Sequence, residues 1–163
     1  MYARILVPLD GSVRAERVLP HVEPLAERFG ASVTLLHASE PPAEPIAAAG
    51  MPAAVAVAPV LGSGPAETAA ADRPEGASHL DAVADRLRAR GVTVAVETPE
   101  GPAAEAILAR AEETGADLIA MTTHGRGGLG RLVFGSVADQ VLRGAPCPVL
   151  LVRVRDEEER DHT

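Results

Sequence analysis

The segment of this sequence best suited to chemistry is a glycine-rich stretch in its last third, followed by a serine at a predicted helix start. The first glycines of the stretch are Gly125, Gly127, Gly128 and Gly130. Glycine lets a backbone approach a ligand closely, and the N–H groups and positive dipole end of a helix beginning at Gly135 and Ser136 favour an anion. Arg126 and Arg131 add positive charge. The pattern is typical of phosphate binding; the alternative is that the glycines shape a tight turn and Ser136 only caps the helix.

Two well-known phosphate-binding motifs do not match this stretch. A P-loop needs a lysine after its second glycine, and the chain contains no lysine. The dinucleotide fingerprint directly follows the first strand, whereas Gly125 lies far beyond the first predicted strand, Arg4–Pro8. Any phosphate site here therefore belongs to neither class.

Four further side chains invite a chemical interpretation. Asp10 follows a predicted strand on the side where a ligand would lie, although with Gly11 it could simply close a turn. No His, Ser or carboxylate is spaced to orient His124 as a base, so we expect it to brace the glycine-rich loop. We expect His37 to be a core or pocket-wall histidine. We expect Cys147, which leads into a predicted buried strand, to be inert. The sequence thus predicts a binding site without catalytic residues or a metal cluster.

The elements that must position these residues are strands alternating with helices. Runs of Val, Leu and Ile predict strands at residues 4–8, 32–38, 92–97, 117–122 and 148–154. In the third run Val92, Val94 and Val96 alternate with smaller or polar residues, which indicates a strand with one wet face, as at a sheet edge.

Helical periodicity fills the intervals between these runs. The predicted helices cover residues 13–29, 78–91, 102–115 and 136–143. Ser12 is placed to cap the first helix, and Pro20 and Pro24 predict that it is irregular or kinked. Ser78 and Asp81 have the spacing of a capping box for the second.

This alternation predicts an α/β fold, a doubly wound, Rossmann-like parallel sheet with helices on both faces and right-handed crossovers. The carboxyl ends of parallel strands lie at one edge, so residues 8–10, 37–39 and 121–125 should gather there, where such folds bind ligands.

Two segments fall outside the alternation. Residues 39–76 are rich in Pro, Ala and Gly and longer than a usual connection, which indicates a lid, a contact surface or a mobile loop. The acidic residues 156–163 are expected to form a solvated tail. A length of 163 residues predicts one domain, over residues 1–155.

Composition excludes several classes of partner. The formal net charge is −8, from 23 acidic and 15 basic residues, so the surface repels nucleic acid and anionic lipid. The weakly polar residues 46–64 are too often interrupted by Gly and Pro to span a membrane. One cysteine and an N-terminus without signal-peptide features lead us to expect a cytoplasmic protein.

Taken together and in order, three blocks resemble the universal stress protein family. They are Ile-Leu-Val-Pro-Leu-Asp-Gly-Ser at residues 5–12, Leu-Leu-His-Ala at residues 35–38, and the segment from Met121 through Gly135-Ser136 to Val152. The resemblance covers the chain except for the long loop and the tail.

The resemblance implies a five-stranded sheet in the order 3-2-1-4-5 and a homodimer formed through the last strand. Some members bind ATP through Gly-x-x-Gly, nine residues, then Gly-Ser or Gly-Thr. Gly125, residues 126–134 and Gly135-Ser136 match the second and third parts, whereas Thr122 stands at the first glycine.

Residue by residue, the resemblance places Asp10 at the ribose or a phosphate-bound metal, the backbone of Ala38 at adenine and Thr122 at the ribose. Gly125, Gly135, Ser136 and Val137 would donate to the phosphates. The complete expected binding set is Pro8, Leu9, Asp10, Ala38, Met121, Thr122, His124, Gly125, Arg126, Gly128, Gly135, Ser136 and Val137.

We therefore expect a switch rather than an enzyme. The protein would bind ATP, with or without Mg²⁺, and its bound state would be read by other proteins. Any hydrolysis should be slow, because the sequence shows no general base, metal cluster or arginine-finger arrangement. The alternative, which Thr122 keeps open, is a dimeric interaction module of the same family that binds no nucleotide.

Overall fold

The computed structural model describes residues 1–39, 75–124 and 135–154. Its strands form one five-stranded sheet in the order β3-β2-β1-β4-β5, in which every neighbouring pair is parallel. The strands are β1 (Arg4–Pro8), β2 (Ser32–Leu36), β3 (Val94–Glu97), β4 (Leu118–His124) and β5 (Val149–Val154). The predicted parallel sheet and its strand order are confirmed.

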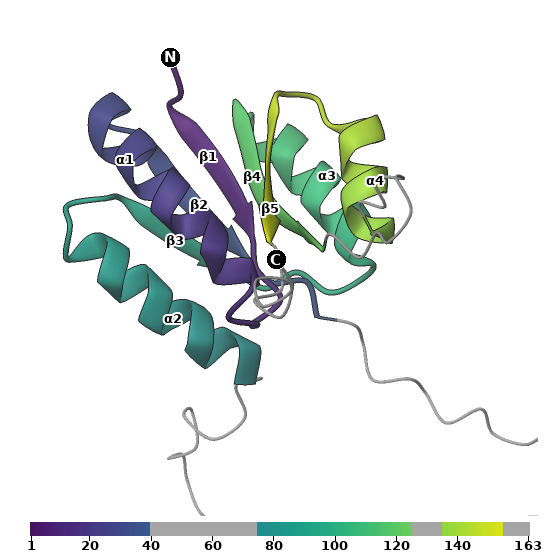
Figure 1. Cartoon of the computed structure of the whole chain (residues 1–163), viewed down its shortest axis with the longest axis horizontal. Coiled ribbons are helices and arrows are strands. Elements are labelled where there is room, and N and C mark those ends of the chain that lie inside the picture. The colour runs from purple at the N-terminus through teal and green to yellow at the C-terminus, as the bar shows by residue number, and fades with distance from the viewer. Residues whose placement is uncertain (40–74, 125–134, 155–163) are drawn as a thin grey trace, which may run out of the picture.

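Helices cover both faces of this sheet (Figure 1). The elements are the short 3₁₀ helix η1 (Ala15–Val18) and the helices α1 (Leu19–Phe29), α2 (Glu75–Arg88), α3 (Ala103–Thr114) and α4 (Ser136–Gly144). The buried residues of η1, α1 and α2 share one apolar cluster, and those of α3 and α4 share another. The sheet therefore separates two cores, as a doubly wound fold requires.

The central strand β1 contributes to both cores. Ile5, Leu6 and Val7 are all fully buried; Ile5 and Val7 pack with α1 and α2, and Leu6 packs with α3 and α4. Side chains alternate between the faces of a strand, so a strand covered on both sides is apolar throughout. Each such side chain stabilises the fold by about 1.5–3 kcal/mol.

The two edge strands differ from β1. In and just before β3, Val92 and Val94 are buried whereas Thr93 and Ala95 are exposed, which confirms the predicted wet face. The expectation that Cys147 leads into a buried strand is wrong, because β5 is the other edge of the sheet and the side chains of residues 149–152 are only half-buried.

The predicted first helix divides in two, in agreement with its expected irregularity. The Ser12 hydroxyl accepts a hydrogen bond from the Ala15 amide (3.1 Å), η1 follows, and α1 starts with Pro20 in its first turn. Proline fits there because the first amides of a helix have no intrahelical partner. Phe29 is 40% exposed rather than in the core, and its ring meets that of Tyr2 edge to face.

The second helix begins earlier than predicted. It starts at Glu75, so Ser78 and Asp81 lie within α2 rather than forming a capping box at its start. Its predicted apolar stripe is correct, since Leu80, Val83, Ala84 and Leu87 are all buried. The proposed loop and the tail lie almost entirely outside the described residues.

Within the described ranges, none of the helices combines the length and the apolar character that a bilayer span demands.

Candidate functional site

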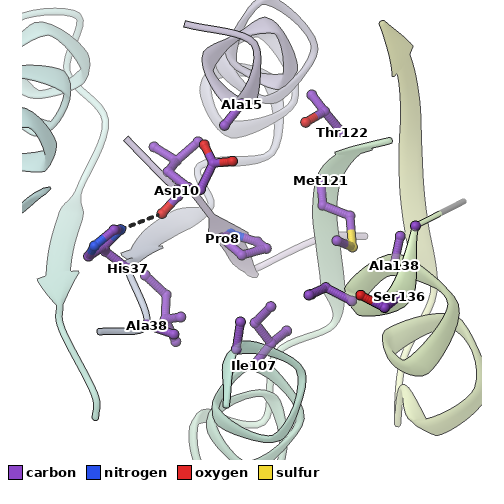
Figure 2. Close-up of a pocket in the computed structure, with 15 residues that line it drawn as sticks. Pro8, Asp10, Ala15, His37, Ala38, Ile107, Met121, Thr122, Ser136 and Ala138 are labelled. Atoms are coloured by element: carbon purple, nitrogen blue, oxygen red, sulfur yellow. Dashed lines mark hydrogen bonds between the residues drawn. The ribbon is translucent and has the colours of Figure 1, made fainter. Parts of the chain in front are cut away.

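A cavity of about 310 Å³ lies at the carboxyl edge of the sheet (Figure 2). This volume is at the lower end of the range for small-molecule sites. The cavity is lined by Pro8, Leu9, Asp10, Ala15, Leu36, His37, Ala38, Ala103, Ile107, Met121, Thr122, Gly135, Ser136, Val137 and Ala138. These residues come from the ends of β1, β2 and β4 and the starts of η1, α3 and α4, so the topology brings together what the sequence separates.

The ends of β1 and β2 are joined by two hydrogen bonds. The Leu9 amide donates to the Leu36 carbonyl (2.8 Å), and His37 Nδ1 lies 3.0 Å from the Leu9 carbonyl oxygen. Because a carbonyl oxygen can only accept, the proton of this second bond is on Nδ1. His37 therefore fixes the wall in which it lies, in agreement with the expectation of a pocket-wall histidine.

One part of the cavity is apolar. Leu36, Ile107, Met121 and Ala138 are buried members of the core that packs against α3 and α4, and each also lines the cavity. Their side chains form a surface on which the flat face of a ring could lie without losing hydrogen bonds to water.

The start of α4 gives the cavity a polar part, made of backbone N–H groups. Gly135 precedes the helix with a φ of 79°, a left-handed value that favours glycine, and among the described residues no side chain caps the helix. The Asp139 amide makes the first backbone bond, to the Gly135 carbonyl. The amides of Ser136, Val137 and Ala138 precede that bond, in the turn where helix N–H groups point outward and attract an anion.

Asp10 adds a carboxylate to the cavity wall. It is exposed, and its Oδ1 accepts hydrogen bonds from the amide (2.9 Å) and the hydroxyl (2.5 Å) of Ser12. This turn is the one that the alternative interpretation of Asp10 expected, and Asp10 nevertheless lines the cavity.

Thr122 lines the cavity from within a regular strand. It pairs with Val152 of β5 within β4 and is half-buried. A β-branched residue is well suited to this extended backbone. The consequence of having threonine at the first motif position is therefore steric, since its side chain takes up space that a glycine would leave open.

The predicted residues divide into three groups. Nine of them line the cavity: Pro8, Leu9, Asp10, Ala38, Met121, Thr122, Gly135, Ser136 and Val137. His124 is the last residue of β4. Gly125, Arg126 and Gly128 lie outside the described residues, and so does Arg131.

Sequence reasoning did not single out five lining residues, which are Ala15, Leu36, Ala103, Ile107 and Ala138. Ala103 could have been found, because it starts the helix after β3 and the starts of helices meet the carboxyl ends of strands. Ile107 lies four residues, about one turn, further along the same face. The other residues have small or aliphatic side chains, whose type alone does not indicate a place in a binding site.

Two other features bear on the chemistry. In the described parts of the chain, no three His, Cys, Asp or Glu residues gather where they could hold a metal ion. Cys147 lies away from the cavity lining and is half-buried; burial, together with the negative charge of Asp117, raises the pKa of its thiol. A raised pKa makes a thiol less reactive.

Comparison with known sequences connects this geometry to relatives. A model of the universal stress protein family matches residues 1–153. A universal stress protein of Methanocaldococcus jannaschii is 32% identical over 97% of this chain and 86% of its own length. One of Thermus aquaticus is 37% identical over 94% of this chain and all of its own length.

Solved structures share the fold. That of the hypothetical protein MJ0577 has a TM-score of 0.68 at 24% identity and covers 96% of this chain and 99% of its own. A universal stress protein in complex with cAMP has a TM-score of 0.64 at 22% identity, covering 94% and 98%. One from Archaeoglobus fulgidus in complex with dAMP has a TM-score of 0.61 at 22% identity, covering 93% and 98%. With its strand order, its carboxyl-edge cavity and a family match over nearly its whole length, this chain belongs to the universal stress protein family.

Proposed function

We propose that the cavity binds an adenine nucleotide and that the protein acts as a stress-response switch whose bound state is read by other proteins. The observation that carries this proposal is that one cavity combines an apolar wall with the uncapped N-terminus of α4. A nucleotide needs both environments, an apolar one for its base and hydrogen-bond donors for its phosphates.

The residues present fit such a ligand. Ile107, Met121 and the apolar residues around them suit the base, and the backbone of Ala38 lies at the same edge. The first amides of α4 and the Ser136 hydroxyl suit a phosphate. Asp10 suits a ribose hydroxyl or a Mg²⁺ ion already bound to phosphates, because Mg²⁺ commonly takes one or two carboxylates and completes its shell with water.

The relatives support the same ligand class. Two solved structures of this fold contain cAMP and dAMP, and the motif at Gly125 and Gly135-Ser136 resembles that of the ATP-binding members. We take ATP with Mg²⁺ as the first ligand to test, and a switch in the cytoplasm as the role. Binding without rapid hydrolysis suits a switch, because the occupied fraction of the protein then follows the concentration of the nucleotide.

The test is thermal unfolding of nucleotide-stripped protein with and without Mg-ATP, AMP, cAMP and dAMP. Ligand at about 100 times its dissociation constant adds roughly 2.7 kcal/mol of stability. For a chain of this size the unfolding temperature should rise by roughly 5–10 °C.

A pair of variants at Gly135 assigns any rise to the cavity. Both G135A and G135D place a side chain at a φ of 79°, where a Cβ meets no atom of the described residues within 4 Å, so the backbone strain is matched. Only G135D adds a negative charge among the phosphate donors. We expect G135A to keep the rise and G135D to lose it; equal rises in both would show that the nucleotide binds elsewhere.

Thr122 favours a second candidate function, a dimeric interaction module that binds no nucleotide. The threonine side chain narrows the cavity where the motif has glycine, and the half-buried edge strand β5 offers a surface for a second copy. Absence of a thermal shift with every nucleotide, together with a dimer in gel filtration, would favour this module over the switch.

A further inference from the structure

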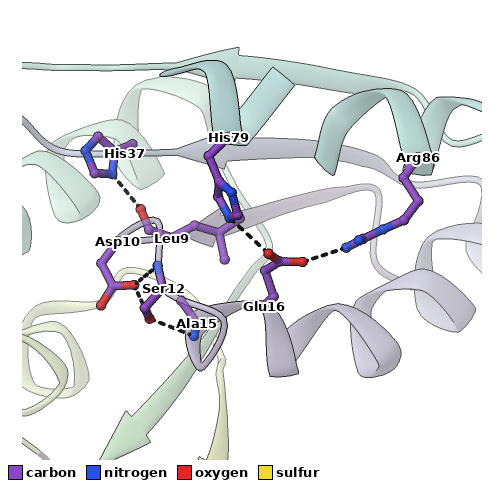
Figure 3. A network of polar contacts seen from close by, with 8 residues as sticks. All are labelled: Leu9, Asp10, Ser12, Ala15, Glu16, His37, His79 and Arg86. Atoms are coloured by element: carbon purple, nitrogen blue, oxygen red, sulfur yellow. Dashed lines mark hydrogen bonds and ion pairs between the residues drawn. The ribbon is translucent and has the colours of Figure 1, made fainter. Parts of the chain in front are cut away.

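One wall of the cavity is a short segment held at both ends. Leu9 and Asp10 belong to the connection between β1 and η1, Ala15 is the first residue of η1, and all three line the cavity. At its start, Leu9 is bonded to β2 through the Leu36 carbonyl and His37. In its middle, the Ser12 hydroxyl joins Asp10 to the Ala15 amide (Figure 3). Glu16 follows Ala15 directly, so the contacts of the Glu16 side chain help to set the position of this wall.

Glu16 connects that far end to α2. Its Oε1 lies 2.9 Å from His79 Nε2, and its Oε2 accepts a hydrogen bond from Arg86 at 2.9 Å (Figure 3). His79 and Arg86 are seven residues apart, about two helical turns, so both lie on the same face of α2. A single carboxylate thus spans two turns of the helix, next to a residue of the cavity wall.

The same wall and helix share a core. Leu9 and Ala15 belong to the apolar cluster that contains Leu80, Val83 and other buried residues of α2. Packing sets the distance between the two elements, and the hydrogen bond from Arg86 to Glu16 sets how η1 is turned against α2. Loss of these contacts should leave the core in place and let the wall shift.

We infer that Glu16 is a positioning residue for the cavity, which holds the β1–η1 wall to α2 and so links ligand affinity to the docking of α2. The inference rests on the proposed function for its ligand. Linkage is reciprocal: if α2 stabilises the wall in its binding position, ligand in the cavity stabilises α2 by the same factor.

The chain provides a matched control. Glu23 of α1 forms an equivalent ion pair with Arg90, just beyond the end of α2, and its side chain is 15% exposed against 20% for Glu16. Glu23 does not line the cavity. E16Q removes a sheltered charge between η1 and α2, and E23Q removes one between α1 and the residue two positions after α2, but only Glu16 is next to the cavity wall.

The first experiment needs no nucleotide. Hydrogen exchange of the free protein, read by mass spectrometry over residues 9–18, reports on the amides of Ala15 and Glu16, which bond to Ser12. We expect E16Q and R86M to speed this exchange at least about fivefold, R86K to restore it and E23Q to leave it unchanged. Equal acceleration by E16Q and E23Q, or none by E16Q, would overturn the inference.

The second experiment measures affinity for ATP, cAMP and dAMP by titration calorimetry. We expect E16Q to weaken binding about fivefold or more and E23Q to leave it unchanged. If the wild-type protein binds nucleotide and E16Q binds it equally well, the linkage is absent and the inference fails. If the wild type binds none, the proposed function fails, and the exchange experiment alone decides the role of Glu16.

Discussion

At the scale of single residues, Thr122 shows why a motif must be read with its backbone. In a loop, replacing glycine by a β-branched residue would restrict the backbone. In β4 the same threonine lies in an extended conformation, paired with Val152, and costs no strain. The departure from the motif therefore changes the shape of the cavity and leaves its framework intact.

Other residues of the site show where sequence reasoning ends. Pro8, Leu9, Asp10 and Ala38 could be placed at the cavity because the carboxyl ends of parallel strands must meet. The hydrogen bond from His37 to the Leu9 carbonyl could not be predicted, because it depends on side-chain rotamers and on the register of two strands. The type of a polar residue indicates that it can have a role, but its hydrogen-bond partners can be identified only in the folded structure.

Cys147 gives a pH-dependent prediction. Burial and the charge of Asp117 raise the pKa of its thiol in the folded state, so the folded chain holds this proton at pH values where the unfolded chain has lost it. Below the ordinary thiol pKa the effect is absent; above it, the stability of the fold falls as pH rises. Urea unfolding under reducing conditions from pH 7 to 10 should show a steeper fall for the wild type than for C147A. Parallel curves would contradict this assignment.

At the scale of elements, α3 both supports the core and shapes the cavity. Ile107 is 2% exposed and packs with Ala104 and Ala111 against the sheet while lining the cavity. Sequence periodicity predicted this helix and its glycine end correctly, since Pro102 precedes it and Gly115 follows with a φ of 58°.

Truncation of Ile107 should therefore be costly. We expect I107A to lower the free energy of unfolding by about 2–5 kcal/mol and I107V by about 0.5–1.5 kcal/mol. A109S, on the exposed side of the same helix, should stay within about 0.5 kcal/mol of the wild type. Denaturant titration at fixed pH measures all three, and a cost for I107A as small as that for A109S would contradict the packing described for α3.

Element boundaries were harder to predict than element types. Helix α2 already includes Glu75, so the capping-box spacing at Ser78 and Asp81 was misleading. Strand β4 extends to His124, two residues beyond its prediction, because Thr123 and His124 pair with Arg153 and Val154 of β5. The first polar residues indicate where a strand leaves the apolar core, whereas backbone pairing with the neighbouring strand decides where the strand ends.

At the scale of the whole molecule, the two edges of the sheet differ in how they are protected. On β3, the outward-facing carbonyl of Val94 accepts a hydrogen bond from Arg88 of α2 at 2.9 Å. On β5, the pairing with β4 directs the amide of Arg153 away from the sheet. The half-buried apolar residues around it make β5 the edge at which we propose a second copy binds.

This proposal predicts different effects at the two edges. R153P removes an outward N–H without removing a bond to β4, so we expect the protein to elute as a monomer in gel filtration with light scattering. R88M uncovers the Val94 carbonyl and should leave the dimer intact. A dimer that survives R153P and is lost in R88M would place the interface on β3 instead.

The guanidinium of Arg88 also limits how far an assembly can grow. A sheet that is open at both edges can add strands without end, as filaments do. Arg88 occupies one outward carbonyl of β3, which makes this edge less available, and two copies that pair through β5 use the other edge of each copy. Such an assembly closes at two subunits, because both copies contribute the same edge and neither β5 is left to recruit a third.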